Sequence, residues 1–289
     1  MSDYPNILSI AGSDSGGGAG IQADLKTITV LRAYGLSVIT ALTAQNGTGV
    51  SGIQATPEDF VSRQYTAVRE GFKIAAAKTG MLCNRAVMLS LLPLLRERDF
   101  PLVVDPVCVS QSGHSLLEAS ALDTLRESIL PLADLLTPNI PEAEALTGLR
   151  ISGRKDLEPA ALRLHELGAG AVLIKGGHAR MREEEETRMT DWLSLKGGPL
   201  QPLSHRRVST PNNHGTGCAL SAAIAVFLGQ GENLENAVRR AQSFLVRALE
   251  KSFSPGSGAG PVNFLAGAGL DQNFLPPGGV IRRMEPDVD

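Results

Sequence analysis

Short apolar runs alternate with helix-like periods along most of the chain. The first apolar run, at residues 6–11, is followed by Ile21, Leu25, Ile28 and Leu31, which recur at steps of three or four residues. Such steps place side chains on one face of a helix, whereas a short continuous apolar run is typical of a buried strand. The pattern therefore predicts a strand, a loop and a helix, in that order.

The same alternation continues toward the C-terminus. The further strands that we predict lie near residues 36–42, 74–77, 102–104, 135–136 and 171–174. The further helices that we predict start or lie near residues 57, 86–96, 119–129, 141, 157–167, 218 and 234. Strands that alternate with helices form a mainly parallel sheet with helices on both faces. We therefore expect a three-layer α/β fold.

The chain shows no clear division into domains. No linker-like stretch interrupts it, and its 289 residues suit one large α/β domain, which we predict over residues 1–270. The tail at residues 271–289 is rich in Gly and Pro, so we expect it to be poorly ordered. The charged tract at residues 180–188 is interpreted as a solvated loop, with a lid over a phosphate site as the alternative.

Composition restricts the classes of partner. The 27 Lys and Arg residues against 30 Asp and Glu leave no surplus positive charge to bind nucleic acid. No apolar run approaches the ~20 residues that span a bilayer, and the N-terminus lacks the features of a signal peptide. The cysteines Cys83, Cys108 and Cys218 follow no metal-ligand spacing, and any disulfide would leave one unpaired. We therefore expect a cytoplasmic protein that binds neither nucleic acid nor membrane.

A glycine-containing turn leads into the apolar run at residues 219–228. Its sequence is His214-Gly215-Thr216-Gly217-Cys218. The glycines allow a tight turn that exposes N–H groups at a helix N-terminus, where an anion is attracted. The same position lowers the pKa of a thiol from about 8.5 toward neutrality. Cys218 is therefore a candidate base or nucleophile, and a packed cysteine behind an ordinary turn is the alternative.

Polar residues follow most of the predicted strands. In open parallel sheets, ligands bind beyond the carboxyl ends of the strands. Carboxylates bind hydrated Mg²⁺, and lysine offsets the charge of transferring phosphate oxygens. The residues at these positions are the loop 12–20, Gln45, Lys78, Asp105, Asn139, Glu142, Lys175, Gly176, Gly177 and His178. This set indicates an Mg²⁺ and phosphate site, although Asp105, Asn139 and Glu142 also suit ordinary turns and helix starts.

Two known phosphate-binding patterns give little support for other enzyme classes. The P-loop pattern does not occur in the chain. Residues 18–23 match the dinucleotide pattern Gly-x-Gly-x-x-Ala, but residues 37–48 contain no Asp or Glu to bind the ribose. A nicotinamide-dependent dehydrogenase is therefore a secondary alternative.

Several segments, taken together, closely resemble the bacterial hydroxymethylpyrimidine/phosphomethylpyrimidine kinases, a thiamine-synthesis branch of the ribokinase-like superfamily. They are residues 11–24, 43–46, 78–81, 105–107, 137–139, 175–178 and 214–218. The resemblance extends in order from about residue 6 to residue 265. Many members of the superfamily have Asp as the catalytic base where this chain has Cys218, which favours the pyrimidine kinases over the sugar kinases.

The resemblance implies a ribokinase-like fold and two phosphate transfers at one site. Mg·ATP would phosphorylate 4-amino-5-hydroxymethyl-2-methylpyrimidine and then its monophosphate. Cys218 would take the proton of the attacking hydroxyl, while the N–H groups of Gly215, Thr216, Gly217 and Cys218 would hold the developing charge. The resemblance also implies a homodimer.

The same resemblance assigns the remaining site residues. The pyrimidine would be bound by Gly12, Ala19, Asp24, Gln45, Met81 and Val107, with Asp24 and Gln45 hydrogen-bonding to the ring. ATP would contact Asn139, Lys175 and Gly177, and Mg²⁺ would be organised by Asp105 and Glu142.

One departure from the family pattern affects the second phosphate transfer. Gln111 stands where the family commonly has lysine, so a positive charge near the expected entrance is lost. A pyridoxal kinase that shares the Gly-Thr-Gly-Cys motif is the alternative function, since both substrates are small heteroaromatic alcohols. A non-catalytic regulator that binds a nucleotide or vitamer is the second alternative.

Overall fold

The fold is built on a mainly parallel sheet, seen in a computed structural model that describes residues 4–107, 119–176 and 187–270. The sheet has nine strands within these residues, in the order β3-β2-β1-β4-β5-β6-β7-β8-β9. The strands are β1 (Asn6–Asp14), β2 (Tyr34–Asn46), β3 (Gly49–Ala55), β4 (Ile74–Thr79), β5 (Leu102–Val104), β6 (Leu135–Leu136), β7 (Ala171–Ile174), β8 (Arg188–Leu195) and β9 (Leu200–Arg206). Strands β2, β1, β4, β5, β6 and β7 are parallel, whereas β3, β8 and β9 run antiparallel to their neighbours.

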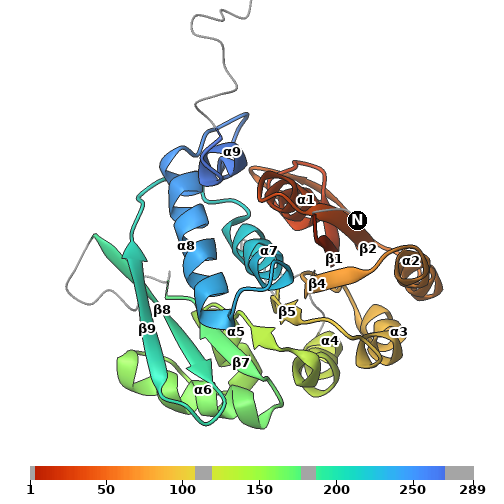
Figure 1. Ribbon diagram of the computed structural model, residues 1–289, viewed down its shortest axis with the longest axis horizontal. Helices are drawn as coiled ribbons and strands as arrows, with labels where there is room; N and C mark the ends of the chain where they lie inside the picture. The colour runs from red at the N-terminus through yellow and green to blue at the C-terminus, as the bar shows by residue number, and fades with distance from the viewer. Residues whose placement is uncertain (1–3, 108–118, 177–186, 271–289) are drawn as a thin grey trace, which may run out of the picture.

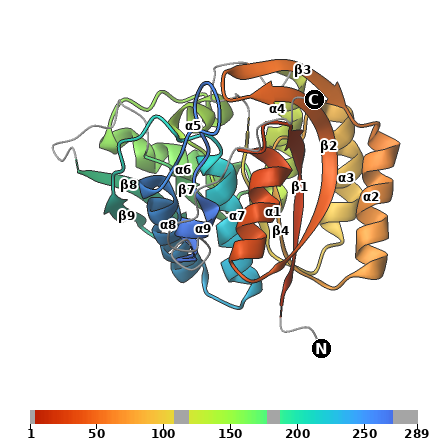
Figure 2. The same cartoon turned by 90° about the horizontal axis from the view of Figure 1, so that it is seen from above.

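Helices cover both faces of the sheet, as Figure 1 and Figure 2 show. They are α1 (Gly20–Val30), α2 (Glu58–Gly71), α3 (Arg85–Arg96), α4 (Ala119–Thr124), α5 (Ile140–Thr147), α6 (Leu157–Glu166), α7 (Thr216–Gly229), α8 (Leu234–Glu250) and α9 (Phe264–Gly267). Helices α1, α7 and α8 pack on one face, and α2, α3, α4 and α6 pack on the other. The predicted three-layer α/β architecture is confirmed.

Two hydrophobic cores lie on opposite faces of the sheet. Side chains of β1 alternate between them, since Leu8 and Ile10 belong to one core and Ile7 to the other. Helix α7 is apolar on all sides, and residues 219–227 are buried throughout. The helix therefore lies deep in the molecule, and its N-terminus is held at the end of the sheet where the parallel strands finish.

The antiparallel hairpin formed by β2 and β3 differs from the predicted organisation. Residues 45–49 were expected to form a loop, but β2 continues to Asn46 and pairs with β3. Most of β3 is exposed, so its sequence lacks the apolar alternation that marks a half-buried strand. In the described part of the chain, no helix is both long enough and apolar enough to cross a bilayer.

Candidate active site

Asp14 organises the glycine-rich loop between β1 and α1. Its carboxylate accepts hydrogen bonds from the N–H groups of Gly16, Gly18 and Ala19, at 2.8, 3.1 and 2.7 Å. The Nε2 atom of His214 lies 2.9 Å from Asp14 Oδ2. Burial alone would raise the pKa of Asp14, but the bond and charge of His214 and the N–H donors hold it below the ordinary value. Asp14 is thus a charged anchor of the loop.

The loop before α7 lies directly against this first loop. Gly215 has a φ of 79°, and a Cβ atom there would lie only 1.8 Å from the carbonyl oxygen of Gly18. Both the conformation and the close approach therefore require glycine at this position. The bond between His214 and Asp14 joins the same two loops through side chains. Two segments about 200 residues apart thus form one rigid wall of the site.

The N-terminus of α7 faces a cluster of charged side chains. Thr216 N–H donates a long bond of 3.4 Å to the carbonyl of Asn213. A Cβ atom on Gly217 would lie 3.5 Å from both Asp105 Oδ2 and Lys175 Nζ. The start of α7 therefore lies in close reach of the charged pair. Helix N-termini attract negative charge, so the helix start and Lys175 together suit the binding of a phosphate group.

Asp105 and Lys175 form the centre of the charged cluster. Lys175 Nζ lies 3.0 Å from Asp105 Oδ1 and 3.9 Å from Glu142 Oε2. Asp105 also accepts hydrogen bonds from Thr137 Oγ1 at 3.3 Å and Ser221 Oγ at 3.4 Å. Burial alone would lower the pKa of Lys175, but the charges of Asp105 and Glu142 raise it, so the lysine stays protonated.

Asn139 and Glu142 form a capping box at the start of α5. Asn139 Oδ1 accepts from the N–H of Glu142 at 2.9 Å, and Glu142 Oε2 accepts from the N–H of Asn139 at 2.8 Å. Asn139 and Glu142 therefore do form a helix start, which was one of the two roles that the sequence allowed for them. Burial, together with the nearby charge of Asp105, raises the pKa of Glu142 to about 7 against the opposing charge of Lys175. Glu142 therefore changes protonation state near neutral pH.

The described side chains of the site offer too few ligands to bind a metal ion without a further ligand such as a nucleotide. Among the described residues, no three His, Cys, Asp or Glu side chains lie together as a metal site. Asp105 and Glu142 contribute two carboxylates at one place, beside the ammonium of Lys175. Mg²⁺ commonly keeps several waters and uses one or two carboxylates plus substrate phosphates. The donor set therefore fits Mg²⁺ that arrives with a nucleotide.

A pH dependence of stability follows from Glu142. The pKa of Glu142 is about 7 in the folded protein, against the ordinary value of 4.5 in the unfolded chain. Between these two pH values, the folded protein keeps a proton on Glu142 that the unfolded chain has released. The free energy of unfolding should therefore fall by about 1–3 kcal/mol as pH rises through that window. We expect Glu142→Gln to remove this fall, as measured by urea denaturation at a series of pH values without nucleotide or metal.

The control for this prediction is Glu158→Gln, at an exposed position on α6. This variant should keep the wild-type dependence of unfolding free energy on pH. An unchanged slope in Glu142→Gln would show that Glu142 does not titrate in the folded protein within this range.

The environment of Cys218 contradicts the low thiol pKa that the sequence predicted. Burial, with added repulsion from Asp24 and Asp105, raises the pKa of Cys218 to about 11, although Lys78 opposes the rise. The helix N-terminus alone would have lowered it. Desolvation and two carboxylates outweigh that effect, so Cys218 is a neutral thiol in this structure.

Asp24 lies behind the pocket and is paired with Lys78. Lys78 Nζ is 3.0 Å from Asp24 Oδ2 and 3.1 Å from Oδ1, and Ser9 Oγ donates to Oδ2 at 2.6 Å. Both side chains of the ion pair have an exposed fraction of zero. Both carboxylate oxygens are thus engaged by Lys78 or Ser9, and the expected hydrogen bond from Asp24 to the substrate ring stays a prediction. A carboxylate at this depth serves to compensate the buried ammonium of Lys78.

The other expected substrate residues lie around the two loops and the start of the β2–β3 hairpin. Gln45 Nε2 lies 3.4 Å from His214 Nε2, close to Asp14 and the Ala19 N–H. A Cβ atom on Gly12 would lie 2.5 Å from Met81 Cε, so these two residues are in contact. Val107 is half-buried, and its N–H donates to the carbonyl of Asp105. Gly177 and Gln111 lie outside the described residues.

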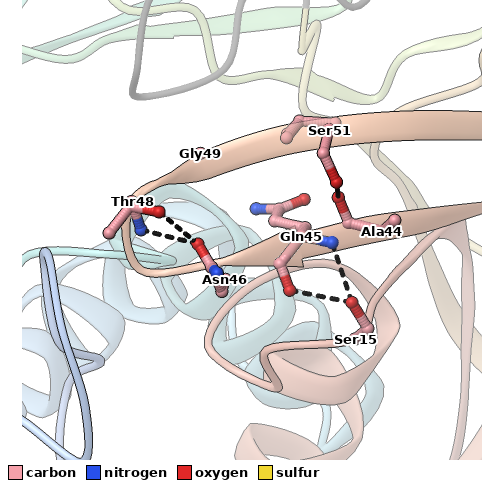
Figure 3. Close-up of a pocket in the computed structure, with 8 residues that line it drawn as sticks. Ser15, Ala44, Gln45, Asn46, Thr48, Gly49 and Ser51 are labelled. Carbon is pink, nitrogen blue, oxygen red and sulfur yellow. Dashed lines mark hydrogen bonds between the residues drawn. The ribbon is translucent and has the colours of Figure 1, made fainter.

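The hairpin also borders an open pocket next to Gln45. This pocket has a volume of about 430 Å³ and is lined by Ser15, Ala44, Gln45, Asn46, Thr48, Gly49, Val50 and Ser51, as Figure 3 shows. Ser15 Oγ donates to the carbonyl of Gln45 and accepts from its N–H, both at 2.8 Å. These bonds connect the glycine-rich loop to β2 and fix the backbone of Gln45.

Sequence reasoning missed two buried acidic residues in or next to the site. Asp14 appeared only as one member of the glycine-rich loop, although an Asp followed by glycines is a known turn signal. Asp191 lies within β8 next to apolar residues and is buried. A charged residue within an apolar strand needs a partner inside the protein, and this requirement could have identified Asp191 from the sequence.

Comparison with known proteins gives one matching family model and several similar relatives. A family model described as phosphomethylpyrimidine kinase matches residues 14–263. The hydroxymethylpyrimidine/phosphomethylpyrimidine kinase of Haemophilus influenzae is 44% identical over 267 residues, which cover 92% of this chain and 98% of that protein. The thiamine biosynthesis bifunctional protein ThiED of Geobacter sulfurreducens is 45% identical over 264 residues, covering 91% of this chain. The match covers 53% of that longer protein, so the chain corresponds to about half of it.

Solved structures show the same fold. The ADP complex of Bacillus subtilis pyridoxal kinase has a TM-score of 0.82 and 32% identity, covering 91% of this chain and 98% of that one. The phosphomethylpyrimidine kinase of Clostridium difficile 630 has a TM-score of 0.73 and 37% identity, covering 85% of this chain and 100% of that one.

Proposed function

Because the chain belongs to the phosphomethylpyrimidine kinase family, we propose that it transfers phosphate from Mg·ATP to hydroxymethylpyrimidine and then to the resulting monophosphate. Both transfers serve thiamine biosynthesis and use one site. The observation that carries this proposal is the meeting of Asp105, Lys175 and the N-terminus of α7 at one end of the parallel sheet. The enzyme is a phosphotransferase of the ribokinase-like fold.

The charged cluster handles the transferring phosphate. Lys175 contacts phosphate oxygens of the nucleotide, and the N–H groups of Gly217 and Cys218 receive the negative charge that develops on them. Asp105 and Glu142 lie where they can hold Mg²⁺ with the nucleotide. When bound, Mg²⁺ supplies charge neutralisation at these oxygens. Asn139 fixes Glu142 through the capping box, and we retain Asn139 and Gly177 as proposed nucleotide contacts.

The proton of the attacking hydroxyl passes to Cys218 late in the reaction. Phosphoryl transfer has a loose transition state, so the nucleophile does not need to lose its proton before attack. The hydroxyl becomes more acidic as its oxygen bonds to phosphorus, which allows a weakly ionised thiol to act at that stage. The positive charge of Lys78 favours the thiolate once it forms, against the burial that disfavours it.

The substrate ring occupies the side of the site formed by Gly12, Ala19, Gln45, Met81 and Val107. Gln45 supplies hydrogen-bonding atoms at the ring edge, and the other residues form the walls. Such a pocket fits a neutral heteroaromatic ring. Asp24 holds Lys78 behind the site, and we retain its hydrogen bond to the ring as a proposal from the family resemblance. We retain the cytoplasmic location and the homodimer as proposals from the family resemblance.

Pyridoxal phosphorylation is the second candidate function. The fold matches the Bacillus subtilis pyridoxal kinase with a TM-score of 0.82. Identity to the pyrimidine kinase of Haemophilus influenzae is higher, at 44% against 32% for that pyridoxal kinase. The proposal therefore predicts a higher kcat/KM for hydroxymethylpyrimidine than for pyridoxal, by about tenfold or more, as expected for a pocket fitted to one ring.

The comparison uses saturating Mg·ATP and measures ADP release with each alcohol in turn. An equal or higher kcat/KM for pyridoxal would assign the chain to the pyridoxal kinases. Tight binding of Mg·ATP and of the pyrimidine without ADP release would instead support a non-catalytic regulator.

A further inference from the structure

Asp191 connects Gly176, the residue after Lys175, to helix α8 and strand β9. Asp191 Oδ1 accepts a hydrogen bond from the N–H of Gly176 at 2.9 Å. Asp191 Oδ2 accepts from Gln242 Nε2 of α8 at 2.8 Å and lies 3.3 Å from His205 Nε2 of β9. Only 3% of Asp191 is exposed, so its charge depends on these partners rather than on water.

The peptide of Gly176 lies against β8. Backbone pairing between β7 and β8 ends at Ile174, opposite Trp192. Beyond this point the Gly176 N–H bonds to the side chain of Asp191. A Cβ atom on Gly176 would lie 1.9 Å from the carbonyl oxygen of Thr190, so the peptide lies flat on β8. Asp191 therefore fixes the peptide unit immediately next to Lys175.

Lys175 itself is held on its other side. Its N–H donates to the carbonyl of Pro138 at 2.8 Å, and its Nζ reaches Asp105 at 3.0 Å. The backbone at Lys175 is thus held by two anchors, the carbonyl of Pro138 at its own N–H and Asp191 at the N–H of Gly176, while Asp105 holds the ammonium group. A small shift of a phosphate-binding lysine is costly, because positioning contributes much of phosphoryl-transfer catalysis.

The contacts of His205 require a doubly protonated ring. Its Nδ1 lies 3.2 Å from the carbonyl oxygen of Arg206, and its Nε2 faces Asp191 Oδ2. A carbonyl and an ionised carboxylate only accept hydrogen bonds, so both ring nitrogens must carry hydrogen. Burial alone would lower the pKa of His205, but the bond and charge of Asp191 raise it above its ordinary value.

Other charges near His205 leave this pairing intact. Arg188 of β8 opposes protonation of His205. Arg206 of β9 is paired with Glu250 of α8 at 2.7 Å. Gln242, the α8 residue that reaches Asp191, is neutral. Asp191 is therefore the group that stabilises the charged ring.

We propose that Asp191, ion-paired with protonated His205, is a positioning residue that holds the Gly176 peptide and places Lys175 for the nucleotide phosphates. When His205 loses its proton, the buried carboxylate keeps its charge without a charged partner, which weakens its hold on the Gly176 N–H. Nucleotide affinity then falls at alkaline pH. The inference rests on the proposed nucleotide contact of Lys175.

The test is calorimetric binding of Mg·ADP to the full chain at a series of pH values. We expect Asp191→Asn, which keeps the shape and an acceptor for Gly176, to bind about tenfold more weakly at neutral pH. We expect wild-type affinity to fall as pH rises through the titration of His205, and His205→Gln to show no such fall. NMR titration of His205 should give a pKa that drops in Asp191→Asn.

His165→Gln is the matched control. His165 is also buried, and it bonds to the carbonyl of Ala169 and to Ser194 Oγ, both at 2.9 Å. This variant should bind Mg·ADP with the wild-type affinity and pH dependence. A merely structural role for Asp191 would lower stability in Asp191→Asn without changing nucleotide affinity.

The outcomes separate this inference from the proposed function. Mg·ADP affinity in Asp191→Asn equal to wild type, or the same pH dependence in His205→Gln, would overturn the inference alone. Nucleotide binding with the expected pH dependence but no pyrimidine phosphorylation would overturn the proposed function alone. No binding of Mg·ADP by the wild type would overturn both. If Asp191→Asn fails to fold, the pH dependence of Mg·ADP affinity in His205→Gln and the NMR pKa of wild-type His205 still test the inference.

Discussion

Replacement of Cys218 by Ala is expected to reduce turnover by a factor on the order of 10² or more while leaving KM values within several-fold. Cys218 sits at the start of α7, where Asp105 and Lys175 meet the helix. Loss of the thiol removes the group that takes the hydroxyl proton, but it removes no wall of the pyrimidine pocket. Steady-state kinetics with Mg·ATP and hydroxymethylpyrimidine measure both quantities.

Cys83→Ala is the matched control, since Cys83 is the other cysteine among the described residues. That variant should turn over at the wild-type rate. If Cys218→Ala also retained wild-type turnover, the thiol would be a packing residue and the proton would leave through water. Because the pKa of Cys218 is about 11, its role should also be insensitive to pH near neutrality.

Lys78→Met is expected to lower the free energy of unfolding by about 3–5 kcal/mol. The ammonium of Lys78 and the carboxylate of Asp24 lie 3.0 Å apart, and both side chains have zero exposure. Methionine keeps the unbranched apolar stem, one atom shorter than lysine, but leaves the Asp24 charge buried with Ser9 as its remaining side-chain donor among the described residues. Chemical denaturation by urea measures the change.

A second variant and a control make this prediction specific. Lys78→Met combined with Asp24→Asn should recover a large part of the lost stability, because no charge then remains unpaired. Arg63→Met breaks the exposed pair with Asp59 and should cost less than about 1 kcal/mol. Wild-type stability in Lys78→Met would contradict the presence of a charged pair at this depth.

The layered fold could be predicted because its signals are local. Apolar runs near residues 74–77 and 171–174 became β4 and β7, and the apolar run at residues 219–228 became the buried helix α7. Polar residues after these strands met at one end because carboxyl ends of parallel strands share an edge. Asp105, Glu142 and Lys175 were thus expected near each other, and the structure places them together.

The features that could not be predicted from the sequence depend on burial and on pairing between distant residues. Asp24 and Lys78 are 54 residues apart, and no local pattern indicates that they meet inside the protein. The thiol pKa of Cys218 was predicted from the helix terminus alone, but it depends on burial and on carboxylates from α1 and β5. The β3 strand was missed because an exposed strand has no apolar alternation. Such features depend on packing between distant segments.

The most direct test of the proposed function is the identification of products by mass spectrometry. The purified protein is incubated with Mg·ATP and, separately, with hydroxymethylpyrimidine, its monophosphate and pyridoxal. The proposed function predicts the pyrimidine diphosphate from both pyrimidine forms, even with Gln111 in place of the family's lysine. Pyridoxal phosphate as the main product, or pyrimidine monophosphate that is never converted further, would contradict the two-step pyrimidine kinase.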